Sequence, residues 1–207
     1  QVYPQANAEL ALRPTAARLF AFLLLHRQMA HLREVVAETF WESSDLDRAR
    51  RNLNTTLWQL RKAFRQTSDQ PANLITTTPE QIRLNRDAEL WLDLALFEEK
   101  AKKGLVNAAN GSALAAINAL DQAVDLYQGD LLHGFYDPWV LQERERLRLS
   151  YWRRLRRLMT IQQDQGNLEA SIDYAQRILH VEPWHEDIHR TLMMLYAENG
   201  RRTRAMA

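Results

Sequence analysis

The segment from residues 48 to 65 has the spacing of an amphipathic helix with one apolar and one basic face. Projected at about 100° per residue, its apolar side chains fall on one side, as expected for a helix that packs on a core. They are Ala49, Leu53, Leu57, Leu60 and Phe64. The opposite side carries Arg48, Arg51, Asn54, Thr55, Trp58, Lys62 and Arg65. The fold therefore has to bury the first side and leave the second exposed.

The exposed side of this helix has the chemistry of a DNA-reading surface. No Asp or Glu occurs from Arg48 to Ser68, whereas a face that is only solvated usually mixes both signs of charge. Arg and Lys suit phosphates, and Asn and Thr suit base edges, so the pattern predicts a helix in the DNA major groove. A basic solvent face without a ligand is the simpler alternative. Trp58 fits a sugar or thymine contact and a protein interface equally well.

The elements around this helix predict a winged helix-turn-helix domain over residues 1–86. Short strands are expected at 2–3 and 9–12, and helices at 14–26 and 31–41. The second helix should turn Leu32, Val35, Val36, Thr39 and Phe40 inward, and Asp47 should cap the third helix. The runs at 74–78 and 81–84 predict a hairpin. As a wing it would reach the neighbouring backbone or minor groove, with Arg83 as a candidate contact, and a plain edge hairpin explains the pattern about as well.

The charge distribution also favours the first part of the chain as the nucleic-acid-binding part. Residues 1–86 carry 12 Arg or Lys against 8 Asp or Glu, whereas residues 87–207 carry 15 against 18. The chain has no cysteine, which excludes thiol catalysis and Cys-based zinc sites. No apolar run approaches the ~20 residues that span a bilayer. We expect a cytoplasmic, nucleoid-associated protein with no membrane partner and no cofactor.

Residues 87–207 predict an all-helical domain of tetratricopeptide-like repeats. Helices are expected at 93–103, 112–128, 138–165, 168–179 and 185–199, with loops at 107–111 and 129–135. Gly166 and Gly200 are 34 residues apart, the period of a tetratricopeptide helix pair. The final pair stops before its second helix is complete, so we expect the native protein to continue.

Two further patterns in this half invite a functional interpretation. His185-Glu186-Asp187-Ile188-His189 matches the H-E-x-x-H zinc motif, but its third position is charged and no third ligand is signalled. We therefore expect no metal and no enzymatic activity. Seven arginines between residues 144 and 157 form a second basic group, which is either a solvated helix with ion pairs or an auxiliary surface for DNA or an acidic partner. On the same helix an inward stripe is expected from Leu147, Tyr151, Leu155 and Leu158.

Several motifs carry a family resemblance. Tyr127-Gln128-Gly129-Asp130, then Trp139, then Glu143-Arg144-Glu145-Arg146-Leu147 resemble the bacterial transcriptional activator domain. Upstream, Arg51-Asn52-Leu53 and Leu60-Arg61-Lys62-Ala63 resemble the OmpR-like winged helix that precedes this domain in antibiotic-regulatory (SARP-like) activators. Gln81-Ile82 departs from the Gly-Tyr that is usual in the wing.

The resemblance implies sequence-specific binding to double-stranded DNA and transcriptional activation. It also implies homodimers on direct repeats and contact with RNA polymerase. The rival interpretation is a tetratricopeptide-like interaction module whose basic helix binds an acidic protein.

Overall fold

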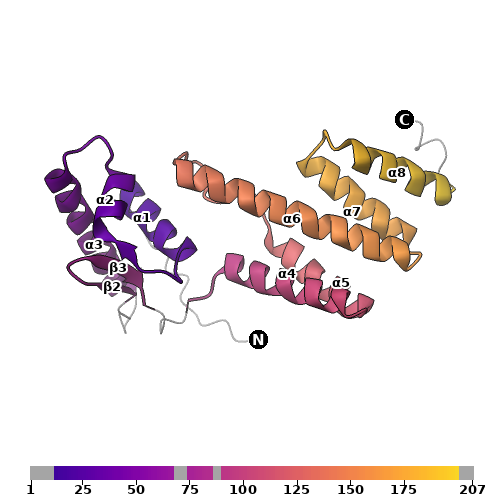
Figure 1. Cartoon of the computed structure of the whole chain (residues 1–207), viewed down its shortest axis with the longest axis horizontal. Helices are drawn as coiled ribbons and strands as arrows, with labels where there is room; N and C mark the ends of the chain where they lie inside the picture. Colours follow the sequence, from indigo (N-terminus) through magenta and orange to yellow (C-terminus); the bar gives the residue numbers. More distant parts are fainter. Residues whose placement is uncertain (1–11, 68–73, 86–89, 201–207) are drawn as a thin grey trace. The chain divides into compact units, whose positions relative to one another are not determined.

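The computed structural model describes residues 12–67, 74–85 and 90–200, and in this part the chain is mainly α-helical (Figure 1). Its elements are α1 (Pro14–Leu25), β1 (His31–Leu32), α2 (Arg33–Phe40), α3 (Leu46–Thr67), β2 (Ile75–Thr77), β3 (Gln81–Leu84), α4 (Asp93–Ala109), α5 (Ala113–Leu126), α6 (Pro138–Asp164), α7 (Leu168–Val181) and α8 (Glu186–Glu198). The chain divides into two compact units, Gln1–Leu90 and Trp91–Ala207. None of the described helices is long and apolar enough to cross a bilayer.

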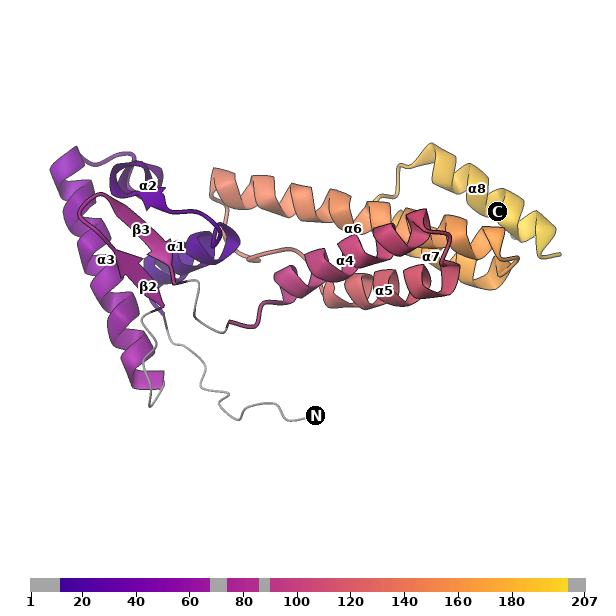
Figure 2. The ribbon, with the colours of Figure 1, turned by 60° about the horizontal axis from the view of Figure 1, so that its bottom comes forward.

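The first unit is built around the apolar side of α3, as the sequence predicts. Leu53 and Leu60 are completely buried, and Ala49, Leu57 and Phe64 are nearly so. They share one core with side chains of α1, α2 and the strands. Figures 1 and 2 show α1, α2 and the strands gathered along one side of α3. The other side of α3 is therefore left without a neighbour inside this unit.

The strands form a small antiparallel sheet in the order β1-β3-β2, which confirms the predicted hairpin. Its turn is tight, because the N–H of Thr78 donates to the carbonyl of Gln81 across Pro79 and Glu80. Ile82 and Leu84 are buried, and Arg83 between them is exposed. Since side chains alternate along a strand, Arg83 lies on the face of the sheet that points away from the core.

Two local predictions in this unit were wrong. Residues 31 and 32 pair with β3, so the second helix begins at Arg33. Its inner side consists of Val36 and Ala37, while Leu32 and Val35 are about half exposed. Because residues 31 and 32 belong to a strand, the helix starts later and turns Val36 and Ala37 toward the core. The apolar spacing alone did not reveal this.

The helix cap was also misplaced. Helix α3 starts at Leu46, and the N–H of Arg48 donates to Oδ1 of Asp45 over 2.8 Å. Asp45 therefore caps the helix in place of the predicted Asp47, which lies within the first turn. The strands expected at 2–3 and 9–12 lie outside the described residues, except for Leu12, which is not in a strand.

In the second unit each helix packs against the next, from α4 to α8. All five predicted helices are present, but α4 extends to Ala109, into the segment that was expected to be a loop. The predicted inner stripe of α6 is correct, since Leu147, Tyr151, Leu155 and Leu158 are all buried. They form a continuous core with α4, α5 and α7, which fixes the outward faces of these helices.

Candidate nucleic-acid interface

The predicted DNA-facing side chains of α3 are all exposed along one side of the helix. They are Arg48, Arg51, Asn54, Thr55, Trp58, Lys62 and Arg65. Trp58 is 60% exposed, and Nζ of Lys62 lies 5.3 Å from the centroid of its ring. Among the described residues, Arg51, Lys62 and Arg65 form no ion pair with a carboxylate. We call this surface the α3 face.

The N-terminal end of α1 borders the α3 face beside Trp58 and Lys62. Arg13 precedes α1, and together with these side chains it lines a shallow hollow of about 200 Å³. The first turn of a helix has free N–H groups and the positive end of the helix dipole. This edge therefore combines two cationic side chains with the positive end of the α1 dipole, a combination that suits phosphate oxygens.

Two arginines that the sequence analysis did not select border the α3 face near Asn54. Arg33, in the first turn of α2, donates a hydrogen bond to Oδ1 of Asn54. Arg61 donates to Oγ1 of Thr77 over 2.7 Å. Burial and the nearby charge of Arg61 lower the pKa of Arg33, which shows that the two guanidinium groups repel each other. Helical projection would have located Arg61, but Arg33 comes from another element and could be found only in three dimensions.

Two acidic side chains near the N-terminal part of α3 lie against Arg50. Glu34 forms an ion pair with Arg50, and Oδ1 of Asp47 lies 3.7 Å from the same guanidinium. The hairpin turn contributes Glu80, whose carbonyl accepts the N–H of Arg33 over 2.8 Å. Arg83, on the outer face of the sheet, is not brought to the α3 face.

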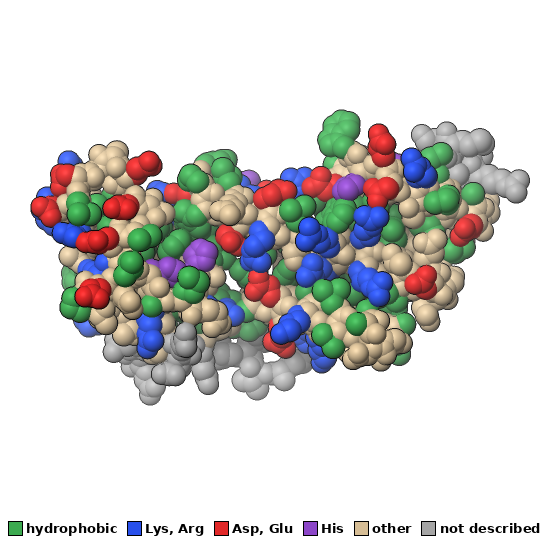
Figure 3. Space-filling model, viewed as in Figure 1, with side chains coloured by type: hydrophobic (Ala, Val, Ile, Leu, Met, Phe, Trp, Pro, Cys, Tyr) green, Lys and Arg blue, Asp and Glu red, His purple; other side chains and the backbone are tan. Residues whose placement is uncertain are grey.

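The arginines of α6 are mostly engaged within their own unit. Arg144 donates to the carbonyls of Leu131, Leu132 and Phe135, and its side chain is only 16% exposed. Three others form ion pairs: Arg146 with Glu98 and Glu143, Arg148 with Glu182, and Arg156 with Asp187. Figure 3 shows basic and acidic side chains side by side along α6. These contacts support the interpretation of α6 as a solvated helix with ion pairs.

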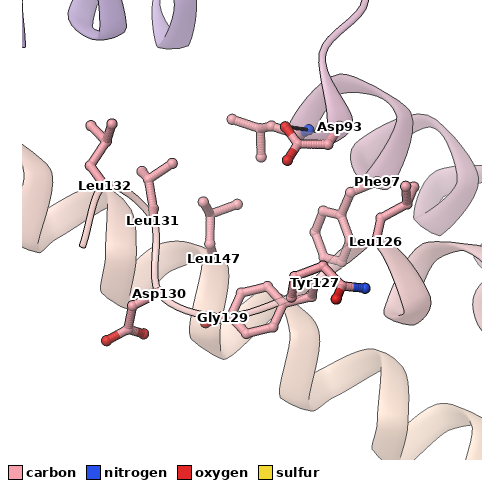
Figure 4. A pocket seen from close by; sticks show the side chains of 11 residues that line it. Asp93, Phe97, Leu126, Tyr127, Gly129, Asp130, Leu131, Leu132 and Leu147 are labelled. Atoms are coloured by element: carbon pink, nitrogen blue, oxygen red, sulfur yellow. Dashed lines mark hydrogen bonds between the residues drawn. The ribbon is translucent and has the colours of Figure 1, made fainter. Parts of the chain in front are cut away.

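The segment that Arg144 holds forms one wall of a hollow of about 310 Å³. Its other walls come from the start of α4, the end of α5 and the middle of α6, and Figure 4 shows Leu131, Leu132 and Leu147 facing Asp93 and Phe97 across it. Leu132 has a φ of 50°, a left-handed conformation that is unfavourable for leucine. Three carbonyls converging on one guanidinium explain how this backbone is held.

The two histidines of the H-E-x-x-H motif have structural contacts. The ring of His185 stacks on Trp152 at 4.7 Å, and its Nδ1 lies 3.1 Å from Oδ1 of Asp187. Nε2 of His189 lies 2.7 Å from the carbonyl of Pro183. Within the part of the chain that the structure describes, no three His, Asp or Glu side chains cluster as metal ligands do. The motif joins α8 to α6.

Comparison with known proteins places the second unit in a family. The model of the bacterial transcriptional activator domain matches residues 92–207, more than half of the chain. The chain belongs to this family. The transcriptional regulatory protein MoaR1 of Mycobacterium tuberculosis is 25% identical over 187 residues, which are 90% of this chain and 60% of that protein. The regulatory protein AfsR of Streptomyces coelicolor is 28% identical over 122 residues, 58% of this chain and 12% of AfsR.

A solved structure extends the similarity to both units of this activator-domain chain. The fold resembles that of Mycobacterium tuberculosis EmbR, solved in complex with a low-affinity phosphopeptide, with a TM-score of 0.79 at 20% identity. The match covers 93% of this chain and 51% of EmbR. The chain thus spans about three fifths of MoaR1 and half of EmbR. The EmbR match shows the fold alone, whereas family membership and the regulators MoaR1 and AfsR support a role in bacterial transcriptional regulation.

Proposed function

We propose that this chain is the DNA-binding and activator part of a bacterial transcriptional regulator. Residues 1–86 form the winged helix-turn-helix domain, and residues 87–207 form an activator domain of tetratricopeptide-like repeats. The α3 face enters the major groove of double-stranded DNA. The observation that supports this most directly is that Arg51, Lys62 and Arg65 are exposed on one side of α3 without a carboxylate partner among the described residues.

In this proposal some side chains of the α3 face contact DNA phosphates and others contact base edges. Arg48, Lys62 and Arg65 contact phosphates, which supply affinity and its salt dependence. Asn54, Thr55 and Arg51 read base edges, which supply sequence selectivity. Thr55 already donates its hydroxyl proton to the carbonyl of Arg51, so it offers an acceptor and a methyl group to DNA. Trp58 packs on a sugar or a thymine methyl.

Arg33, Arg61 and the N-terminal end of α1 add phosphate contacts at the two borders of the face. Arg83 remains a candidate wing contact, reached only if the backbone wraps around the outer side of the sheet. The two-residue turn at Pro79 and Glu80 is short and acidic, which argues against deep entry into the minor groove. RNA polymerase and a second copy of the chain are the proposed protein partners in the cytoplasm.

The test measures binding of labelled duplexes by fluorescence anisotropy at several salt concentrations. Lys62→Ala should weaken binding on all sequences and reduce the salt slope by about one unit, because one phosphate contact is lost. Lys102, exposed on α4, is the matched control. Lys102→Ala removes the same charge and should leave the slope unchanged.

Asn54→Ala should cost ~1–3 kcal/mol on a selected duplex and much less on random DNA. Equal effects of the two lysine changes, or binding that never discriminates against competitor DNA, would contradict DNA recognition by the α3 face. The second outcome would favour an acidic protein as the partner of this helix.

A further inference from the structure

The side chain of Asn54 is held in one orientation by Arg33. An exposed Asn amide can usually exchange its oxygen and nitrogen by rotation, so it can offer a donor, an acceptor or both to a base. A guanidinium group has only N–H donors. Because Arg33 lies against this amide, Oδ1 of Asn54 has to face Arg33, as the hydrogen bond between them shows.

Arg33 is itself fixed on two sides, so it can act as a positioning residue. Its backbone N–H donates to the carbonyl of Glu80 over 2.8 Å, which ties the first turn of α2 to the hairpin. Burial, and after it the positive charge of Arg61, lowers the pKa of Arg33, so an acceptor beside the guanidinium is favourable. Arg61 donates to Oγ1 of Thr77 over 2.7 Å, whereas Arg33 donates to Asn54. The amide oxygen of Asn54 accepts the hydrogen bond of this guanidinium.

The fixed orientation has a consequence for base recognition. Asn reads adenine with both arms of its amide, since the oxygen accepts from N6 and the nitrogen donates to N7. Guanine offers two acceptors, N7 and O6, at the same edge. The oxygen of Asn54 has two lone pairs and Arg33 occupies one of them, so the amide offers two N–H donors and one remaining acceptor site.

We propose that Arg33 positions Asn54 to read an acceptor edge, guanine N7 and O6, in preference to adenine. This inference rests on the proposed function, because it assumes that the α3 face lies in the major groove. It assigns to Arg33 a role in sequence selectivity that a phosphate contact alone would not have.

The experiment first selects duplexes that bind the full chain and finds the base pair whose discrimination disappears in Asn54→Ala. At that pair, affinities are then measured for guanine, adenine and the two pyrimidines. The expected result for the wild type is a preference for guanine over adenine of at least about fivefold, within the range of one specific base contact.

Arg33→Met keeps the length of the side chain and removes its donors. It should reduce the guanine-to-adenine ratio at this pair to about one or reverse it, because the freed oxygen can then accept from adenine N6. Arg33→Lys, which retains donors, should keep part of the preference. Arg50→Met is the control, because Arg50 lies on α3 close to Asn54 but donates its hydrogen bond to Glu34. It should leave the ratio unchanged.

The possible failures are distinguishable. If the wild type shows no sequence-dependent binding, the proposed function itself is wrong. If binding is selective but Arg33→Met keeps the wild-type ratio, or if adenine is preferred at the Asn54-dependent pair, the positioning role of Arg33 is overturned and the proposed function stands. Circular dichroism of each variant shows whether its fold is intact, and Arg33→Lys provides the comparison if Arg33→Met is unstable.

Discussion

Replacing Arg144 by methionine should strongly destabilise the activator domain. Arg144 lies on α6, and its guanidinium donates to three carbonyls of the segment between α5 and α6, over 3.0 to 3.2 Å. Asp130 adds a carboxylate oxygen at 3.9 Å. The side chain is only 16% exposed, so these bonds are partly shielded from water. Methionine fills much of the same volume but has no donor.

The magnitude follows from the acceptors that lose their partner. A hydrogen bond to a charged group contributes roughly 1.5–3 kcal/mol when both groups are buried. The carbonyls belong to half-buried residues that water can partly reach, so we take about 1 kcal/mol for each of the three. Leu132 can then leave its left-handed conformation, which returns up to ~1 kcal/mol. The expected net loss is about 2–3 kcal/mol of unfolding free energy.

Urea denaturation followed by circular dichroism measures this loss, and a thermal scan should show the melting temperature lowered by about 8–12 °C. Arg146→Met is the matched control on the same helix. Arg146 pairs with Glu98 and Glu143, but its side chain is 49% exposed, and exposed ion pairs contribute less than about 1 kcal/mol. Equal losses in the two variants, or a loss below ~1 kcal/mol for Arg144→Met, would refute the idea that Arg144 stabilises the segment between α5 and α6.

Two other changes test the packing of the activator domain. Gly104→Ala should cost about 1–3 kcal/mol in urea denaturation, because the new Cβ would lie 2.5 Å from Cγ of the completely buried Leu120. A stabilised variant would mean that α4 and α5 can separate easily. Asp121→Asn should alter the pH dependence of stability, since burial raises the pKa of Asp121 above its ordinary value of 3.8 despite the hydrogen bond from Tyr174. A raised folded-state pKa means that wild-type stability falls as the pH rises from about 4 through that pKa, and the variant should lack this decline. Parallel stability curves from pH 4 to 7 would contradict it.

Helical periodicity predicted most of the fold, because each helix buries one stripe of side chains. The stripes of α3 and α6 were correct residue by residue, and the hairpin followed from its β-branched runs. The error at α2 has a physical cause. Residues 31 and 32 also fit a helical spacing, and only the partner strand β3, about 50 residues later, decides that they extend. Local patterns do not contain such long-range pairing.

The candidate interface was predictable only where it lies on a single helix. The exposed positions of α3 follow from the same projection that predicts its buried side. Arg33 was missed because its distance from Asn54 is set by the packing of α2 on α3, and the sheet adds the bond that fixes its backbone. The role of Arg83 depends on which side of the sheet it occupies. Because Ile82 and Leu84 are apolar, their alternation with Arg83 indicates that Arg83 faces away from the core. Only the structure shows where the sheet lies relative to α3.

The two arginine-rich helices show why basic residues in a sequence do not by themselves indicate a nucleic-acid site. A guanidinium carries five donors and needs acceptors wherever it lies. On α6 the unit supplies many of them, through carbonyls at the end of α7 and between α5 and α6 and through carboxylates of neighbouring helices. On the α3 face, Arg51 and Arg65 have no carboxylate partner among the described residues, and Lys62 has only the ring of Trp58. In the proposed function, DNA phosphates supply acceptors for those cations, at a spacing that a helix face can match.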